Sequence, residues 1–347
     1  MGKTTTKELV AGVLGTRYRT LKTEGNYNNE IGLPLMLLKL APAHERAVLE
    51  MGFYQPGEIK FLCDLARPHV GVVTNVYPVH LERAGSLEAI ARGKAELVEA
   101  LPPAPDGVAV LNADDPLVLA MRSVTRARVI TYGLDSEADV WAGEIESLGL
   151  GGIRFELHHR REALQVRVPM LGRHSVHTAL RAAAVGLAED LTWDEIIGGL
   201  QSLGAMQLRL VAVTGPDGSV ILDDTYNASP ESVVAALNLL AELDGRRVAV
   251  LGDMLELGSY EHVGHRLVGR RARDAAHLLV TVGPRARIIA DEAREAGMPA
   301  GDVVELADSD AALAYLRQNI RRGDVVLLKA SRGVRLDQLV PALEVRP

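Results

Sequence analysis

The sequence predicts an α/β protein of two domains. Its 347 residues suffice for about two domains of ~150 residues each. Short apolar, β-branched runs alternate with amphipathic stretches along most of the chain, a pattern typical of parallel sheets covered by helices. The alternation breaks near Gly204 and then restarts, so we expect one domain over residues 1–204 and a second over residues 205–347.

The first domain should contain a mostly parallel sheet with helices on both faces. Its candidate strands and amphipathic helices occur at residues 46–51, 56–66, 69–76, 86–101, 107–111 and 128–132. Within residues 138–170 the apolar residues alternate with period two, and Gly149, Gly151 and Gly152 separate two such stretches, as in antiparallel hairpins. We interpret this segment as a small β excursion, followed by helices at residues 174–187 and 192–203.

The second domain is expected to begin with two strands, at residues 208–214 and 219–224, around a strong turn signal of two glycines, a proline and an aspartate. Strands and helices then alternate, with strands expected at residues 247–251, 277–282, 302–306 and 324–328, and helices at residues 230–243, 260–273, 287–296, 310–320 and from Val334. This stretch is long enough to form a self-contained α/β domain.

Composition excludes several classes of protein. The net charge of −7 gives no basic field that would attract nucleic acid or an anionic membrane surface. No apolar run approaches the ~18 residues needed to span a bilayer, and no signal peptide is recognised at the N-terminus. The single cysteine, Cys63, cannot form an internal disulfide and lies in an apolar pattern, so we expect a core residue in a cytoplasmic protein.

The chain opens with Gly2, Lys3 and Thr4 before a helical pattern. This is the second half of a phosphate-binding loop, in which glycine lets the backbone approach phosphate, lysine supplies a cation and threonine can ligate Mg²⁺. The first glycine of such a loop and the strand before it are not part of the sequence. We therefore expect Met1 to be an internal methionine of a longer chain.

Three other residues stand where an α/β protein binds ligands. Glu50 follows a candidate strand, and the carboxyl ends of strands face the ligand crevice of such sheets. His80 follows another strand, and Lys94 lies on the next candidate helix. Taken singly, Glu50 and His80 are also compatible with solvated loop residues, and Lys94 with an exposed helical lysine. His158, His159, His262 and His265 are expected to be structural rather than metal ligands.

Several motifs together resemble the Mur ligase family, the ATP-dependent amide ligases of peptidoglycan synthesis. They are GNYNNEIGLP at 25–34, LEMG at 49–52, PGEI at 56–59, VHLE at 79–82, LNADDP at 111–116, DDTYNASP at 223–230 and LGDMLELG at 251–258. Within the family they are most similar to the branch that adds D-alanyl-D-alanine. The resemblance implies a central domain like that of P-loop ATPases, followed by a Rossmann-like C-terminal domain, and a monomer is the expected state.

The resemblance also implies roles around ATP and Mg²⁺. Gly2, Lys3 and Thr4 would bind the ATP phosphates, with Thr4 on one Mg²⁺. Glu50 would ligate Mg²⁺ and His80 a second Mg²⁺. Lys94 matches a lysine that is carbamylated in the family, which turns an ammonium into an anion that suits a hard cation. The catalytic set implied is therefore Lys3, His80 and Lys94.

Further contacts to ATP and substrate are implied in the same way. Arg209 and Asp224 would reach the nucleotide from the second domain. Thr178, like Ser175, stands where the family has asparagines that meet adenine. The residues implied near the substrates are Asn28, Asn29, Asn227, Asp253, Glu256, Lys329, Ser331 and Arg332.

The reaction implied joins D-alanyl-D-alanine to a UDP-N-acetylmuramoyl tripeptide and forms ADP. The tripeptide carboxylate would first become an acyl phosphate, which the amine then attacks. Two alternatives stay open, namely a Mur-type ligase that uses another amine and a non-catalytic homologue. The incomplete phosphate loop favours the second alternative, whereas Glu50, His80, Lys94 and Asp224 disfavour it.

Overall fold

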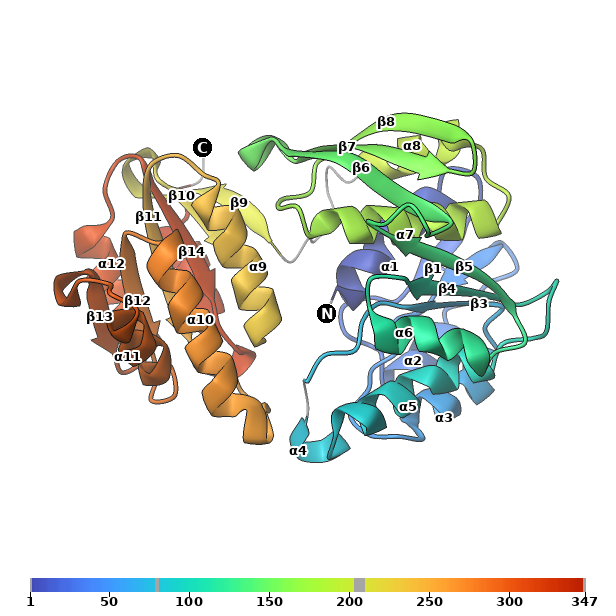
Figure 1. The fold of residues 1–347 in the computed structure, drawn as a ribbon, viewed down its shortest axis with the longest axis horizontal. Helices are drawn as coiled ribbons and strands as arrows, with labels where there is room; N and C mark the ends of the chain where they lie inside the picture. Colours follow the sequence, from blue (N-terminus) through green and yellow to red (C-terminus); the bar gives the residue numbers. More distant parts are fainter. Residues whose placement is uncertain (1, 79–80, 203–209, 346–347) are drawn as a thin grey trace. The chain divides into compact units, whose positions relative to one another are not determined.

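The computed structural model describes residues 2–78, 81–202 and 210–345, which form two compact units (Figure 1). Within the described residues, unit 1 comprises residues 2–78, 83–148 and 152–202, and unit 2 comprises residues 81–82, 149–151 and 210–345. The domain boundary expected at residues 204 and 205 lies outside the described residues and stays a prediction.

Unit 1 is built on a six-stranded sheet of order β3-β4-β5-β6-β7-β8. Its strands are β3 (Val70–Val73), β4 (Val108–Asn112), β5 (Arg128–Gly133), β6 (Val140–Ser147), β7 (Ile153–His159) and β8 (Glu162–Val168). Strands β3 to β6 run parallel, whereas β7 pairs antiparallel with both β6 and β8. The predicted parallel sheet with a β excursion is therefore confirmed, and β6 joins the two parts through a short register with β5.

Helices cover both faces of this sheet (Figure 1). The helices of unit 1 are α1 (Lys3–Leu14), α2 (Gly32–Leu37), α3 (Glu58–Ala66), α5 (Leu87–Glu99), α6 (Pro116–Leu119), α7 (Ser175–Ala188) and α8 (Trp193–Gln201), and α4 (Leu81–Ala84) falls at the junction with unit 2. Helix α7 packs along β3 to β7, and α1 packs against α7 and α8. Gly199 allows this close approach, because a Cβ there would lie 2.4 Å from the Val13 Cα.

A second, two-stranded parallel sheet holds the start of the candidate site. It consists of β1 (Thr20–Lys22) and β2 (Arg46–Val48). The strand expected at residues 46–51 thus ends at Val48, because its partner β1 has three residues, and Glu50 stands just beyond the sheet. Lys7 from α1 donates to the carbonyl oxygen of Thr23 at 2.7 Å and ties this small sheet to the helix.

Unit 2 is a second α/β layer structure with strand order β13-β12-β11-β14-β10-β9. Its strands are β9 (Val211–Thr214), β10 (Val220–Asp223), β11 (Arg246–Gly252), β12 (Leu278–Val282), β13 (Val303–Leu306) and β14 (Asp324–Lys329), and its helices are α9 (Pro230–Ala241), α10 (Glu261–Ala275), α11 (Arg287–Glu295), α12 (Ser309–Asn319) and α13 (Leu339–Leu343). All strand pairs are parallel except β9 with β10. The predicted alternation of strands and helices is confirmed.

Local sequence explains where the main helices of unit 2 begin. Ser229 and Ser232 form a capping box at the start of α9, and Pro230 fits the first helical position, where no backbone donor is needed. Asp308 caps α12 by accepting from the Ala311 N–H. The core lies between these helices and the central strands, where Val250 and Val326 are fully buried.

The expectation that Cys63 lies in the core is met. Cys63 is buried, at 3% exposure, and burial raises the pKa of its thiol to about 12, so this side chain belongs to the core and stays protonated. In the part of the chain that is described, no helix is both long and apolar enough to cross a membrane.

Candidate active site

The phosphate-binding segment lies at the start of α1. Gly2 precedes this helix with φ +76°, a left-handed conformation that favours glycine, and as a glycine it offers no side-chain cap. The start of the helix carries the positive end of the helix dipole, which favours an anion. Thr6 closes the turn from within, because its hydroxyl donates to the Gly2 carbonyl oxygen at 2.6 Å. Lys3 and Thr4 lie in this turn and are half-buried.

Glu50 offers a buried carboxylate oxygen. The residue is 5% exposed, and its backbone N–H donates to the Thr23 hydroxyl at 2.9 Å. Asn28 donates from Nδ2 to Oε1 of Glu50 at 2.8 Å, whereas Oε2 is buried with no hydrogen-bond partner among the described residues. A buried, unpartnered carboxylate oxygen fits the hard ligand set of Mg²⁺.

The polar loop at residues 25–34 is held by its own asparagines. Asn28 orients Glu50, and its carbonyl oxygen accepts from the Gly52 N–H at 2.6 Å. Gly52 is needed for this contact, because a Cβ there would lie 3.0 Å from that oxygen. The Asn29 side chain instead accepts from the N–H of Gly32 at 2.8 Å and stabilises the start of α2. Of the two predicted substrate residues, the structure therefore places Asn28 next to the carboxylate.

Lys94 projects from α5 toward the end of β3. Its Nζ donates to the carbonyl oxygen of Asn75 at 2.5 Å. The pKa of Lys94 is lowered from 10.5 to about 8, chiefly by burial and also by the positive charge of Lys3, while Asp115 acts in the opposite direction. Lys94 is thus not the exposed helical lysine that was one alternative. Its ammonium group is close enough to that of Lys3 for the two positive charges to repel each other.

Two predicted site residues, His80 and Arg209, lie outside the described residues. Among the residues that are described, no group of three or more His, Cys, Asp or Glu side chains is arranged to hold a metal ion. Glu50 is therefore the one predicted carboxylate ligand that the described part supplies, and further ligands would have to come from Thr4, a modified Lys94, His80 or the nucleotide itself.

The start of α7 carries the residues expected near adenine. Ser175 is buried, and its hydroxyl donates to the carbonyl oxygen of Leu171 at 2.7 Å, so it serves the helix start. Thr178 is also buried, at 6% exposure. His177, half-exposed on the same helix, lies 2.7 Å from a carboxylate oxygen of Asp114, and this contact lowers the pKa of the Asp114 carboxyl.

In unit 2 the predicted residues gather where β10, β11 and β14 end. Asp224 follows β10, and Lys329 ends β14, its neighbour in the sheet. Lys329 is 2% exposed and its Nζ lies 2.5 Å from Oδ2 of Asp224 and 3.0 Å from the carbonyl oxygen of Asn227. The exposed Asn227 side chain accepts from the N–H of Ala228 at 2.9 Å.

Asp253 and Ser331 organise the neighbouring loops. One carboxylate oxygen of Asp253 accepts from the backbone N–H groups of Arg285 and Ala286, at 2.9 and 2.7 Å. The Ser331 hydroxyl accepts from the N–H of Leu255 at 2.9 Å. These two predicted substrate residues are therefore partly engaged in holding the loops of unit 2.

Glu256 and Arg332 are the remaining predicted substrate residues, and each follows the carboxyl end of a strand, β11 or β14. Glu256 has φ +63°, an uncommon conformation for a residue with a side chain. Arg332 is exposed and begins the short turn after β14.

Two family models match the sequence. The Mur ligase middle domain matches residues 1–186, and the Mur ligase, glutamate ligase domain matches residues 208–332. The chain belongs to the Mur ligase family. The predicted family and the predicted class of enzyme, a ligase, are thereby confirmed.

Two relatives from different bacteria are named for the same activity. UDP-N-acetylmuramoyl-tripeptide–D-alanyl-D-alanine ligase of Mycobacterium tuberculosis strain CDC 1551 is 39% identical, over 99% of this chain and 71% of that protein. The ligase of the same name from Escherichia coli K12 is 35% identical, over 99% of this chain and 75% of that protein.

Solved structures agree with these relatives. MurF from Acinetobacter baumannii superposes with a TM-score of 0.88 at 32% identity, over 99% of this chain and 74% of that chain. MurF from Thermotoga maritima, solved in complex with ADP, gives a TM-score of 0.84 at 29% identity, over 98% and 76% of the two chains.

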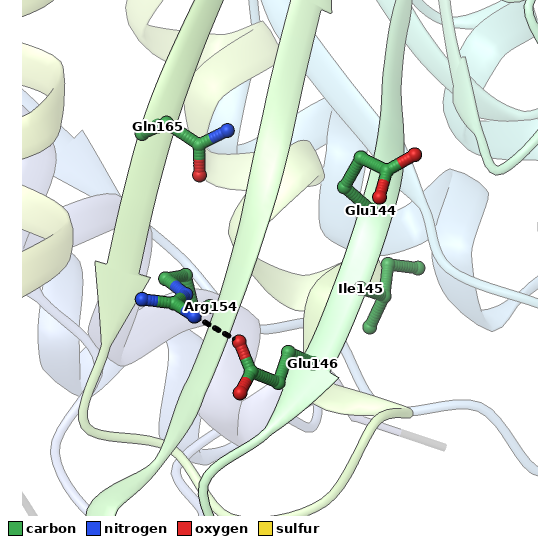
Figure 2. A pocket seen from close by; sticks show the side chains of 5 residues that line it. All are labelled: Glu144, Ile145, Glu146, Arg154 and Gln165. Atoms are coloured by element: carbon green, nitrogen blue, oxygen red, sulfur yellow. Dashed lines mark hydrogen bonds and ion pairs between the residues drawn. The ribbon is translucent and has the colours of Figure 1, made fainter.

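Unit 1 of this Mur ligase also has a surface hollow of about 620 Å³. It is lined by Glu144, Ile145, Glu146, Arg154 and Gln165, on the exposed face of the β6–β8 excursion (Figure 2). Arg154 forms an ion pair with Glu146 across it. None of the predicted site residues lines this hollow, so it does not bear on their assignment.

Three of the four histidines expected to be structural make contacts within the fold. His158 stacks on Trp141 with ring centroids 3.7 Å apart, and His159 lies 2.8 Å from the carbonyl oxygen of Asp139. His265 is fully buried and accepts from the N–H of Met254 at 3.2 Å, and burial lowers its pKa, so the ring stays neutral.

One side chain near the phosphate-binding turn was missed by the sequence analysis. Arg181 lies on α7 and donates to the Thr6 hydroxyl at 2.7 Å. The signal that could have revealed it is composition, because Arg181 is the only charged residue in the apolar stretch between His177 and Glu189. A charge within an apolar helix points to a specific partner.

Proposed function

We propose that this chain is an ADP-forming ligase that joins D-alanyl-D-alanine to a UDP-N-acetylmuramoyl tripeptide. The observation that carries the proposal is the similarity of 99% of the chain, at 35–39% identity, to relatives that bear this activity in their names. The phosphate-binding turn, the buried Glu50 carboxylate and the perturbed Lys94 support it, because each suits a step of phosphoryl transfer.

ATP is the proposed phosphoryl donor, bound at the start of α1. The positive end of the helix dipole, the left-handed Gly2 before the helix and the charge of Lys3 suit a triphosphate. A structural relative was solved in complex with ADP, which supports a nucleotide as a ligand of this fold. We assign Gly2 and Thr4 to the same site, together with Thr178, Arg209 and Asp224.

Mg²⁺ is the proposed metal, with Glu50 as a ligand. The unpartnered Oε2 of Glu50 is the observation that fits this ion. When bound, Mg²⁺ would offset the repulsion between the triphosphate and the substrate carboxylate. We assign His80 and Thr4 as further ligands, with Asn28 positioning Glu50 through its side-chain amide.

Lys94 is the proposed site of carbamylation. Its pKa of about 8 leaves part of the lysine as the neutral amine near neutral pH. That amine can attack CO₂, forming a nitrogen–carbon bond and releasing one proton. The product is an anion that would give the metal site two oxygens and would remove the repulsion between Lys94 and Lys3.

The reaction proposed has two chemical steps. The tripeptide carboxylate attacks the γ-phosphorus of ATP, which releases ADP and leaves an acyl phosphate. The amine of D-alanyl-D-alanine then attacks the acyl carbon, and the tetrahedral intermediate collapses with loss of phosphate. Lys3 and the start of α1 stabilise negative charge on the transferred group.

We propose the loops of unit 2 as the site of the incoming dipeptide. The loops after β10, β11 and β14 lie at the carboxyl ends of parallel strands, where open α/β sheets bind ligands. Arg332 is exposed there and can bind a carboxylate through charge-assisted hydrogen bonds. We further propose that the protein acts as a monomer in the cytoplasm, where ATP is available.

The test is a ligation assay with varied amines. The protein is incubated with ATP, Mg²⁺, the nucleotide-linked tripeptide and either D-alanyl-D-alanine, D-alanine or D-glutamate, and products are identified by mass spectrometry. The proposal predicts a pentapeptide product and ADP with the dipeptide, and neither with Lys3→Ala. Product with a single amino acid alone would identify a different Mur-type ligase, and no product with any amine would favour a non-catalytic homologue.

A further inference from the structure

Arg181 is a buried cation directly behind the phosphate-binding turn. The residue is 4% exposed and is flanked on α7 by fully buried Leu180 and Ala182. Its Nη1 donates to Oγ1 of Thr6 at 2.7 Å. The same nitrogen lies 3.1 Å from the place that a Cβ on Gly2 would occupy. The guanidinium therefore touches both ends of the first turn of α1.

The charge of Arg181 has no anionic partner in the described part of the chain. It forms no ion pair with a described carboxylate, and its Nε is buried without a hydrogen-bond partner there. The guanidinium lies 5.4 Å from the centroid of the Tyr132 ring. Burial raises the pKa of Tyr132 to about 12, so the phenol stays neutral and cannot supply the missing negative charge.

Buried charges are ordinarily paired, because an ion loses its hydration when it enters the protein interior. An unpaired guanidinium next to a helix N-terminus adds to the attraction of that place for an anion. The anion that the proposed function brings to this turn is the triphosphate of ATP.

Thr6 connects Arg181 to the backbone of the turn. Because the Thr6 oxygen accepts from Arg181, its proton is directed to the carbonyl oxygen of Gly2, 2.6 Å away. This relay holds Gly2 in its left-handed conformation. Loss of Arg181 would free the Thr6 hydroxyl to rotate and loosen the turn that faces the phosphates.

We propose that Arg181 is a positioning residue of the phosphate-binding turn, acting through Thr6, and that a bound triphosphate supplies its counter-charge. The inference rests on the proposed ATP site. It goes beyond the residues implied by the family resemblance, because Arg181 and Thr6 are not among them.

The experiment compares two adenine nucleotides with the nucleoside adenosine, which has no phosphate. Binding of ATP, ADP and adenosine is measured by calorimetry for the wild type, Arg181→Met, Thr6→Val and the control Arg17→Met. Arg17 follows the far end of α1 and pairs with Glu195, so its loss removes a positive charge away from the turn. Thermal unfolding without nucleotide is recorded for each protein.

Arg181→Met is expected to weaken ATP binding by about tenfold or more, with adenosine binding unchanged. Thr6→Val should weaken ATP binding in the same selective way but less, and Arg17→Met should not. Without nucleotide, Arg181→Met should melt at or above the wild-type temperature, because it removes an uncompensated buried charge. A merely structural arginine would instead lower the melting temperature and weaken all three ligands alike.

Equal ATP affinity of the wild type and Arg181→Met, or equal losses for ATP and adenosine, would overturn the inference. If Arg181→Met fails to fold, Thr6→Val decides, and an unchanged ratio of ATP to adenosine affinity would reject the relay. A wild-type protein that binds ATP but ligates nothing would contradict the proposed function and leave this comparison intact.

Discussion

The ammonium group of Lys329 lies 2.5 Å from a carboxylate oxygen of Asp224, although the two residues are 105 positions apart. The pair joins the ends of the neighbouring strands β14 and β10. The family resemblance implies separate tasks for the two residues, with Asp224 facing ATP and Lys329 near the amine. Their contact indicates that Lys329 also fixes the position of the Asp224 carboxylate. Lys329 donates a second hydrogen bond to the carbonyl oxygen of Asn227, so it also holds the loop that follows Asp224.

Lys329→Met should destabilise the protein strongly. It leaves the Asp224 carboxylate buried without its cation, and breaking one side of a buried pair costs about 3–5 kcal/mol. Urea denaturation of the wild type and the variant measures this loss. The control is Arg332→Met, whose exposed side chain should change the free energy of unfolding by no more than about 0.5 kcal/mol. Similar small effects of both variants would show that the pair contributes little.

Lys94→Ala should reduce ligation by about 100-fold or more, at the upper end of what loss of a group supporting a metal site costs. A short carboxylic acid such as acetate should restore part of the rate, because it can fill the vacated space with a carboxylate. Ligation is assayed with and without acetate. Lys60→Ala is the matched control, since that lysine is exposed and pairs only weakly with Asp64. Full activity of Lys94→Ala would leave Lys94 without a catalytic role.

The stability of the protein should rise with pH through Lys94. The folded protein loses this proton near pH 8, whereas the unfolded chain keeps it up to the ordinary pKa of 10.5. Between these values the unfolded state binds more protons, so the free energy of unfolding increases with pH. Denaturation in CO₂-free buffer, compared with Lys94→Met, isolates this contribution. A difference between the two proteins that is constant from pH 7 to about 10 would contradict the lowered pKa.

Arg332→Ala should raise the KM for D-alanyl-D-alanine by about ten- to a hundredfold, the effect of losing one charge-assisted hydrogen bond. The KM for ATP should change much less, because Arg332 is assigned to the dipeptide carboxylate. Steady-state kinetics with each substrate varied in turn separate the two effects. A defect confined to ATP would move Arg332 to the nucleotide site.

Strand-to-helix alternation predicted the fold well because it reflects burial on a local scale. The parallel sheets, the β excursion and the second α/β unit all followed from apolar periodicity and turn residues. The three-residue strand β1 was not predicted, and the strand at residues 46–51 was extended too far, because the length of a strand depends on its partner. Pairing partners such as β1 and β2 are far apart in sequence and leave no local signal.

The site was predictable as a set of positions but not as a set of contacts. Glu50 and Asp224 stand after strands, so their place at a sheet edge could be inferred from the sequence. The buried oxygen of Glu50, the ion pair of Lys329 and the unpaired charge of Arg181 depend on packing between distant segments. Such contacts depend on tertiary structure, which local sequence patterns do not reveal.

The acyl phosphate is the centre of the proposed mechanism, and an isotope experiment tests it directly. The nucleotide-linked tripeptide is prepared with heavy oxygen in both carboxylate oxygens of its terminal residue and is then ligated to D-alanyl-D-alanine with ATP. Phosphate and nucleotide products are analysed by mass spectrometry. The account predicts one heavy oxygen in each phosphate released and none in ADP, because the carboxylate oxygen bridges carbon and phosphorus before the amine displaces it. Unlabelled phosphate, or label found in AMP, would contradict it.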